Sequence, residues 1–395
     1  MPPPPSNRRS FLTHLSAGAL LSAAPPLRVT SQPAPHTHPQ DLGLDRAYAL
    51  VQRMLSPRPE YGAAILAGRR DRILPPRAFG RMGTLDAPEV RPDTIFLIAS
   101  CTKPIVASAA CLLIERGLLE LDQPLHEIIP EIAEEQHGIR LIHLMTHTSG
   151  FGSIPRNQEF RATRQPLDRF LREMFKRRTS DFPPGTGVKY CNAGFLLLSE
   201  AIRRASGMST PDFLKKEFFR PLGMPDSFLG RTDQDRSRIS DCVLPPELAA
   251  AVSNWNTDYF HRLANPWGGI FSTVRDYSRF LQMLLNGGEY RGVRVFSPAT
   301  VRMMTGNQIP RLPGLSQAHR IAHATGLGWQ LRDNGHFKFM GSLVSPQSYG
   351  HYGVTGCSVW ADPETGLFMT LFSNKPYSDR ELGIVSNAVA ASLVG

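Results

Sequence analysis

Apolar, strand-like segments at both ends of the chain, with helical segments between them, constrain the fold most strongly. Residues 63–67 form a short apolar run, and a turn leads from it to a second extended segment that ends at residue 80. Near the other end, residues 356–361 and 367–372 are two apolar runs joined by a turn. Short apolar runs bounded by turn residues predict buried strands. The sequence therefore predicts one sheet built from both ends of the chain, with a helical insertion.

Helical periodicity covers most of the sequence between these strands. Glycine and proline interrupt it, and Gly117 marks the expected end of one helix. The expected fold class is α+β, with an antiparallel sheet from both chain ends flanked by helices and a mostly helical lobe. The clearest helical segments are 42–55, 105–116, 196–205, 211–219, 274–285 and 379–393.

The first 40 residues are expected to be a twin-arginine-type export signal followed by a flexible linker. Arg8 and Arg9 stand one residue before a Phe-Leu pair, and a modest apolar stretch follows at 15–24. That stretch is too short to span a bilayer, which needs about 20 apolar residues. We expect an exported protein of the periplasm or cell envelope, without a transmembrane segment in its mature form. The alternative is a cytoplasmic protein with a Pro-rich tail.

The rest of the chain, residues 41–395, is long enough for one enzyme domain with two lobes. The sheet lobe is expected at about 45–104 and 291–395, and the helical lobe at about 105–290. No internal repeat divides the domain further. The sequence leaves the oligomeric state unknown.

The basic charge of the chain does not indicate a nucleic-acid partner. The net charge is +10, but Lys and Arg are scattered and no basic helix alternates with aromatic residues. A solvated basic surface is the simpler interpretation. The expected partner is a small-molecule or peptide-like substrate.

One Ser-x-x-Lys motif, Ser100 to Lys103, lies at the start of a predicted helix. A serine hydroxyl is a weak nucleophile until a neighbouring base takes its proton. Three-residue spacing puts both side chains on the same helix face, and burial favours the neutral lysine that a base must be. By itself this motif is common in chains of this length, so its interpretation depends on whether other catalytic motifs accompany it.

Two further motifs in the sequence have catalytic residue types. Tyr190 and Asn192 form a Tyr-x-Asn triplet, and His351 to Gly353 precedes an expected strand at 354–360. A tyrosine with a lowered pKa shares proton transfer with a lysine, and an asparagine amide bonds a lysine and a substrate carbonyl. A glycine at a strand edge allows close substrate approach, and the next N–H can complete an oxyanion hole.

These motifs, in this order, resemble the serine β-lactamase, penicillin-binding protein and class C-type esterase superfamily. The resemblance extends over most of the chain and includes the segments 144–150 and 268–273. It implies that Ser100 is acylated, that Lys103 and Tyr190 move its proton, and that Tyr190 serves as the base for deacylation. It further implies that Asn192, His351 and Gly353 bind substrate, and that the N–H groups of Ser100 and Val354 form the oxyanion hole.

His351 is the departure from the family pattern that bears on substrate. β-Lactamases usually have a lysine there, which is a fixed cation for a carboxylate, whereas histidine is mostly neutral at pH 7. We therefore expect a carboxylesterase-like serine hydrolase cleaving an ester or amide. The alternatives are a β-lactamase or D-amino-acid peptidase or carboxypeptidase and, in another class, a penicillin-binding sensor that acylates without turnover.

Other kinds of site are not indicated. His143 and His147 are four residues apart, but the glutamate of a zinc-protease motif is missing, so no metal is expected. The sequence has no nucleotide-binding glycine loop and no G-x-S-x-G elbow, so no cofactor is expected. Cys101 and Cys191 are expected to be small packed residues rather than nucleophiles or disulfide partners.

Overall fold

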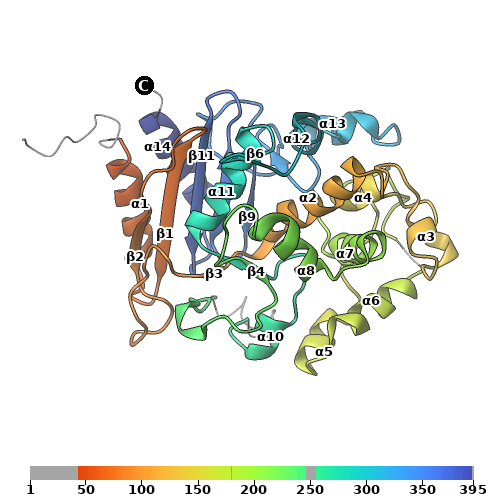
Figure 1. Cartoon of the computed structure of the whole chain (residues 1–395), viewed down its shortest axis with the longest axis horizontal. Coiled ribbons are helices and arrows are strands. Elements are labelled where there is room, and N and C mark those ends of the chain that lie inside the picture. The colour runs from red at the N-terminus through yellow and green to blue at the C-terminus, as the bar shows by residue number, and fades with distance from the viewer. Residues whose placement is uncertain (1–42, 179, 246–254, 394–395) are drawn as a thin grey trace, which may run out of the picture. The chain divides into compact units, whose positions relative to one another are not determined.

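The computed structural model describes residues 43–178, 180–245 and 255–393, which form part of one compact unit beginning at Pro39 (Figure 1). The export signal and linker expected at 1–40 lie outside the described residues. The strands are β1 (Gly62–Arg69), β2 (Arg77–Gly80), β3 (Phe96–Leu97), β4 (Phe228–Leu229), β5 (Ile270–Ser272), β6 (Glu289–Tyr290), β7 (Val293–Arg294), β8 (Gln330–Leu331), β9 (Tyr349–Gly353), β10 (Cys357–Ala361) and β11 (Leu367–Ser373).

Most of the helices lie between β3 and β8 in the sequence, as the helical periodicity predicts. The α-helices are α1 (Asp45–Leu55), α2 (Thr102–Glu115), α3 (Leu125–Ile128), α4 (Leu141–Met145), α5 (Asn157–Ala162), α6 (Leu167–Phe175), α7 (Ala193–Ser206), α8 (Thr210–Leu214), α10 (Asp258–Arg262), α11 (Val274–Leu285), α12 (Pro298–Thr305), α13 (Gln317–Ala322) and α14 (Asp379–Leu393). Short 3-10 turns are η1 (Ala99–Cys101), η2 (Glu134–Gln136), η4 (Arg236–Arg238) and η5 (Ile309–Arg311), and η3 (Lys215–Phe219) is a π-helical turn.

The main sheet joins the two ends of the chain. Its strand order is β2-β1-β11-β10-β9-β8, and every neighbouring pair is antiparallel. The N-terminal β1 pairs with the C-terminal β11 over seven residues, from Ala63 opposite Ser373 to Arg69 opposite Leu367. This confirms the expected α+β class and the sheet assembled from both chain ends.

Alternate residues of β1 enter two different cores because successive side chains of a strand point to opposite faces. Ala63 and Ile65 pack with α1 and α14, whereas Ala64 and Leu66 pack with the core that contains α2 and α7. Both faces of the sheet are therefore covered, and Figure 1 shows α1 and α14 on one side of it. Burial on both faces explains why β1 is a continuous apolar run.

Helix α11 covers the second face of the sheet. It packs against β1, β10 and β11, although residues 274–285 belong to the helical lobe in the division expected from sequence. Its Tyr277 is fully buried, and the Tyr277 hydroxyl donates a 2.9 Å hydrogen bond to the carbonyl of Cys101. A helix of the central region thus supports both the sheet and the turn that precedes α2.

Two local expectations were wrong. The segment 354–360 is not one strand: residues 354–356 form a turn with Gly356 at φ +101°, and β10 then pairs back onto β9. The segment 211–219 is not one regular helix, because α8 changes into η3 after Leu214. In contrast, α11 and α14 have the predicted bounds.

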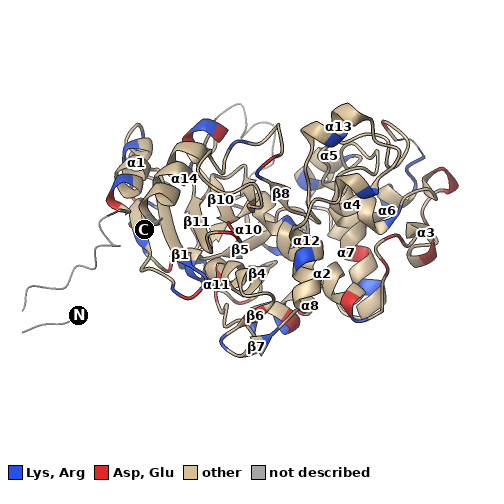
Figure 2. Cartoon of the chain, turned by 90° about the horizontal axis from the view of Figure 1, so that it is seen from above, with Lys and Arg blue, Asp and Glu red and all other residues tan. Residues whose placement is uncertain are grey.

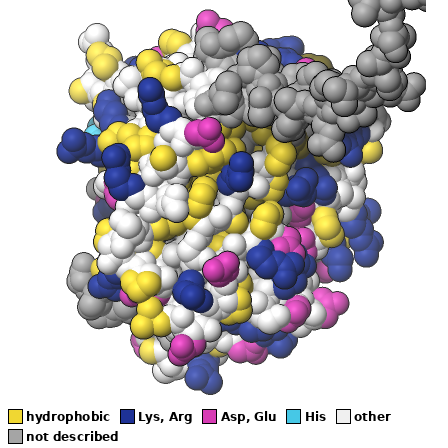
Figure 3. Space-filling model, turned by 90° about the vertical axis from the view of Figure 1, so that its left-hand side faces the viewer, with side chains coloured by type: hydrophobic (Ala, Val, Ile, Leu, Met, Phe, Trp, Pro, Cys, Tyr) yellow, Lys and Arg dark blue, Asp and Glu magenta, His cyan; other side chains and the backbone are white. Residues whose placement is uncertain are grey.

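Charged side chains are dispersed over the surface. Figure 2 shows Lys and Arg interleaved with Asp and Glu, and the face in Figure 3 likewise shows separate basic side chains among acidic and apolar ones. Many basic residues pair with nearby acids, as Arg172 does with Asp168 at 2.7 Å. Within the described ranges, no helix combines the length and apolar character needed to cross a membrane.

Candidate active site

Ser100 lies in η1, immediately before α2, where the chain passes from β3 into the helix. The preceding Ala99 has φ +44°, an uncommon conformation for a residue with a side chain. The backbone is held on both sides, since the N–H of Ile98 bonds the carbonyl of Ile270 and the N–H of Cys101 bonds the carbonyl of Ile98. Strained backbone of this kind is common at functional sites. It leaves Ser100 half-buried at the start of a helix.

Lys103 is fully buried one helical turn after the serine. Its Nζ is 3.1 Å from the Oγ of Ser100 and donates a 2.7 Å hydrogen bond to the carbonyl of Trp267. Burial lowers the pKa of Lys103 to about 7, because a charged ammonium loses its hydration there. Near neutral pH a large fraction of this lysine is therefore an uncharged amine in contact with the serine hydroxyl.

Strand β9 and the turn after it press closely against η1. A Cβ on Gly353 would lie 2.4 Å from the carbonyl oxygen of Ile98 and 3.0 Å from the Cβ of Ala99, so only glycine fits. The hydroxyl of Thr355 donates a 2.9 Å bond to the carbonyl of Leu97. These contacts bring the segment of Val354 beside the serine.

Tyr190 lies over the lysine from the side of α7. Nζ of Lys103 is 4.7 Å from the centre of the Tyr190 ring, and the tyrosine hydroxyl is hydrogen-bonded with Ser100. Although the side chain as a whole is 41% exposed, burial of the hydroxyl end raises its pKa above the usual value, and the bond with Ser100 only partly opposes this. The expected lowered pKa is therefore wrong, and Tyr190 is a neutral phenol that can donate a proton or relay one.

Ser100, Asn192 and Val354 line one cavity of about 210 Å³, so the structure brings these three predicted residues together. Asn192 is exposed and directly precedes α7. The hydrogen bonds of the Lys103 ammonium go to Ser100 and Trp267, so in the described residues the lysine does not rely on the Asn192 amide. That leaves the amide available to a substrate carbonyl.

His351 is buried on β9, behind Tyr190, with ring centres 6.2 Å apart. Its Nδ1 is 2.8 Å from the carbonyl oxygen of Tyr352, which requires the proton to be on Nδ1 and leaves Nε2 as an acceptor. Burial, and then the charge of Lys103, lowers the pKa of His351 to about 3. The imidazole is thus neutral at physiological pH.

Two residues that the sequence reasoning did not assign to the site support the catalytic groups. The carbonyl of Trp267 fixes Lys103, and a backbone acceptor leaves no signal in side-chain spacing. The ring centre of His147 lies 4.5 Å from that of Tyr190, with the rings tilted by 37°, and Nδ1 of His147 accepts the N–H of Cys191. His147 belongs to the segment 144–150, which resembles the family, and that resemblance was the only feature of the sequence that could have pointed to it.

The cysteines are packing residues, as expected for Cys101 and Cys191. Both are buried and free, and burial raises the pKa of each thiol. The Cys101 thiol lies 3.5 Å from the carbonyl of His351, which ties η1 to β9. Among the described residues, no three His, Cys, Asp or Glu side chains are grouped in a way that could hold a metal ion.

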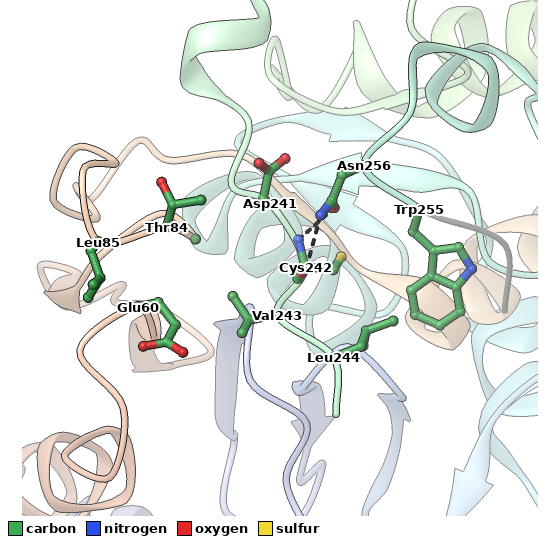
Figure 4. Close-up of a pocket in the computed structure, with 10 residues that line it drawn as sticks. Glu60, Thr84, Leu85, Asp241, Cys242, Val243, Leu244, Trp255 and Asn256 are labelled. Atoms are coloured by element: carbon green, nitrogen blue, oxygen red, sulfur yellow. Dashed lines mark hydrogen bonds between the residues drawn. The ribbon is translucent and has the colours of Figure 1, made fainter. Parts of the chain in front are cut away.

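Two further cavities adjoin this region. One, of about 230 Å³, is lined by Tyr190 and His351 together with His147. The other, of about 700 Å³, lies between Glu60, Asp241 and Trp255, and Figure 4 shows the amide of Asn256 bonded to the backbone of Cys242 at its centre. The larger cavity does not contain the serine, but Trp255 lines both it and the cavity of Ser100.

Comparison with known proteins gives one family over most of the chain. The family model described as Beta-lactamase matches residues 51–392. A relative from Escherichia coli K12, provisionally named D-alanyl-D-alanine carboxypeptidase, is 26% identical over 321 residues, which are 72% of this chain and 70% of the relative.

Solved structures share the fold. A penicillin-binding protein homologue from Caulobacter crescentus superposes with a TM-score of 0.74 at 20% identity, covering 89% of this chain and 98% of the other. The hydrolase EstCE1, described as having promiscuous acyltransferase activity, gives 0.70 at 17% identity, with 89% and 99% covered. The D-amino acid amidase of Ochrobactrum anthropi SV3 gives 0.65 at 23% identity, with 88% and 97% covered.

Proposed function

This chain belongs to the beta-lactamase family of serine hydrolases, and from that premise we propose that Ser100 is its acylated nucleophile. The observation that carries the proposal is the 3.1 Å contact between the Ser100 hydroxyl and Lys103, a fully buried lysine whose pKa is lowered to about 7. A general base works best when its pKa is close to the working pH. Lys103 meets this requirement without any other cation or metal.

In the proposed acylation step, neutral Lys103 takes the proton of Ser100 as its Oγ attacks the substrate carbonyl. The N–H groups of Ser100 and Val354 stabilise the oxyanion, and the nearby amide of Asn192 orients the substrate. Tyr190 then gives its hydroxyl proton to the leaving group and recovers one from the Lys103 ammonium. Water releases the acyl group by the reverse path, losing a proton to Tyr190 as Tyr190 passes its own to Lys103.

We propose that the substrate is an ester, so that the enzyme is carboxylesterase-like. The neutral His351, with its Nδ1 proton committed to the carbonyl of Tyr352, supports this assignment. A β-lactam or a D-alanyl peptide presents a carboxylate on the leaving-group side, and His351 offers no positive charge for it. An ester of a simple alcohol needs none.

A D-amino-acid peptidase or amidase is the second candidate, and a β-lactamase the third. The name of the Escherichia coli relative and the fold shared with the D-amino acid amidase favour peptide-like substrates. A penicillin-binding sensor that acylates without turnover is the candidate from another class. These candidates differ in the bond that Ser100 attacks and in how fast water then releases the acyl group.

A substrate panel tests the proposal. Purified protein is assayed with short-chain p-nitrophenyl esters, nitrocefin and D-alanyl peptides, and we expect the esters to be cleaved with the highest kcat/KM. Ser100→Ala should abolish ester turnover, whereas Ser153→Ala, which changes an exposed serine, should not. Ester turnover that survives Ser100→Ala would refute the nucleophile. A long-lived β-lactam adduct without turnover of any substrate would favour the sensor.

We also propose that the protein is exported to the periplasm or cell envelope by the twin-arginine route. Arg8 and Arg9 support this, together with the apolar stretch at 15–24. Replacing both arginines with lysine should leave the protein in the cytoplasm. Unchanged recovery from the envelope fraction would contradict the route.

A further inference from the structure

Arg161 is a buried cation in the cavity of Ser100, with no anionic partner within the ranges that the structure describes. It lies on α5, is 8% exposed, and lines the same cavity as Ser100 and Val354. The carboxylate of its own helix, Glu159, is bonded to Arg156 instead. Among the described residues, no acidic side chain pairs with Arg161, and its Nε has no hydrogen-bond partner. A buried, unpaired charge is costly, so such a residue calls for an anionic ligand.

Aromatic rings fix the position of this guanidinium. Its central carbon is 5.4 Å from the ring centre of Phe260 and 5.9 Å from that of Trp267. The same Trp267 holds Lys103 through its backbone carbonyl. Trp267 therefore contacts both Arg161 and the catalytic lysine. Because the rings contact the face of the guanidinium, the N–H groups at its edge can still donate hydrogen bonds to a ligand.

Other unpartnered donors line the same cavity. Asn265 is 1% exposed, and neither atom of its side-chain amide has a hydrogen-bond partner in the described part of the chain. The indole N–H of Trp255 is likewise buried without a partner among those residues. None of the described residues that line the cavity is acidic. Buried polar groups are nearly always satisfied, so several unsatisfied donors around one cavity indicate that a ligand rich in acceptors belongs there.

We propose that this cavity binds the acyl part of the substrate, and that the acyl group carries a carboxylate held by Arg161, with Asn265 and Trp255 as further donors. This inference rests on the proposed Ser100 acyl-enzyme. Tyr190, which protonates the leaving group in that mechanism, lines the neighbouring cavity with His351, not the cavity of Arg161. The leaving group therefore occupies the Tyr190 side, and the acyl chain extends toward Arg161.

The two sides of the serine thus differ in charge. The leaving-group side has no lysine or arginine among its described lining residues, and His351 there is neutral, whereas the described lining of the acyl side includes Arg161. Substrates of this class are half-esters of dicarboxylic acids, or acyl groups with an acidic side chain. A carboxylate in the leaving group would gain nothing from Arg161.

A matched pair of esters tests the inference. The substrates are p-nitrophenyl hydrogen adipate and its neutral counterpart, p-nitrophenyl methyl adipate, which differ only in whether the distal carboxyl group is free or methylated. For the wild-type protein we expect kcat/KM to favour the anionic ester by about tenfold to a hundredfold, the usual worth of a charged hydrogen bond in a buried site. Arg161→Met should reduce this ratio to about one, and Arg161→Lys should restore part of it.

Arg169→Met removes an equal charge from an exposed position on α6 and is the matched control, for which the ratio should stay at the wild-type value. A wild-type ratio near one, or an equal fall in both variants, would overturn the inference while ester turnover dependent on Ser100 still stood. If neither ester shows turnover that Ser100→Ala removes, the proposed function fails, and this inference fails with it.

Discussion

At the scale of single residues, Lys103 shows how the fold determines chemistry. An exposed lysine has a pKa near 10.4, and at neutral pH it would be a cation unable to accept a proton. Here the side chain is completely buried, and among the described residues only the hydroxyl of Ser100 and the carbonyl of Trp267 bond its nitrogen. The desolvation that destabilises the charged form is the same effect that supplies the base.

Replacing this lysine should therefore separate stability from activity. Lys103→Met keeps the shape of the side chain, and we expect ester turnover to be lost while the free energy of unfolding at pH 7 rises by about 1–3 kcal/mol. The pKa of Lys103 is lower in the folded protein than in the unfolded chain. Wild-type stability should consequently gain from a rise in pH between about 7 and 10, and the variant should lack this gain. Urea unfolding at pH 7 and pH 9 measures both effects, and a less stable variant at pH 7 would contradict the argument.

The pH dependence of acylation follows from the same residue. Because the neutral amine is the reactive form, kcat/KM for an ester should rise with pH and level off above a midpoint at about 7. His351 should not contribute to this limb, since its pKa is lowered to about 3. Stopped-flow acylation between pH 5 and 9 tests this. A midpoint near 10, or no pH dependence, would exclude Lys103 as the base.

The sequence identified the catalytic side chains better than it predicted the packing around them. Ser100, Lys103 and Tyr190 were found because each belongs to a motif with fixed spacing. Their pKa values depend on burial by distant segments, which is why the direction for Tyr190 was wrong. Trp267 holds Lys103 through its backbone, and Arg161 belongs to no motif, so the three motifs revealed neither of these roles.

At the scale of elements, the site depends on how closely β9 approaches η1. Gly353 removes the side chain that would separate them, and Thr355 and Cys101 bond across the contact. The oxyanion hole proposed at Val354 requires this approach. A displacement of β9 by less than an ångström would move its donor away from the developing charge.

Gly353→Ala should therefore impair catalysis strongly. The added methyl group meets a backbone oxygen at 2.4 Å, which cannot yield without moving β9 or η1. We expect kcat/KM to fall by about a hundredfold, the usual loss for one oxyanion donor. Gly138→Ala is the control, because its added Cβ meets nothing closer than 3.9 Å. Comparable activity for the two variants would show that the close approach is not needed.

The element predictions succeeded where the pattern is local. Helix α11 has a clear amphipathic period, and Thr273, which caps it, accepts the N–H of Asp276 at 3.1 Å. The strand expected at 354–360 failed because the apolar character continues through the turn, and only the positive φ of Gly356 breaks it. The very short β3 and β5 are specified by their pairing with each other rather than by their own sequence.

At the scale of the whole molecule, stability depends on burying polar groups in an uncharged state. His143, His261 and His351 are buried, and burial lowers their pKa values to about 4, 4 and 3. In the unfolded chain they would titrate near 6.5. Asp276 acts in the opposite sense, because burial raises its pKa to about 6.

The protein should therefore lose stability in mild acid. Below pH 6.5 the unfolded chain gains protons that the folded histidines do not accept, at about 1.4 kcal/mol per pH unit for each histidine, and Asp276 offsets about one of the three. We expect the free energy of unfolding to fall by about 4 kcal/mol between pH 7 and pH 5, because two net groups act over about 1.5 pH units. His261→Leu should reduce the fall measured by urea titration. Stability that is constant or higher at pH 5 would contradict this balance.

The arrangement of the sheet was predictable because its long strands are apolar runs bounded by turns at the two ends of the sequence. The division into two lobes was harder to predict, because α11 lies within the helical part of the sequence but packs on the sheet. Such packing depends on contacts between residues far apart in the chain, such as Ser278 with Thr370.

The mass of the acylated protein shows directly whether Ser100 is the nucleophile. The protein is mixed with a slowly hydrolysed ester or a fluorophosphonate, quenched, digested and analysed by mass spectrometry. We expect one adduct, on the peptide that contains Ser100, which is lost in Ser100→Ala and formed far more slowly in Lys103→Met. An adduct on another residue, or one that forms equally well in Ser100→Ala, would contradict it.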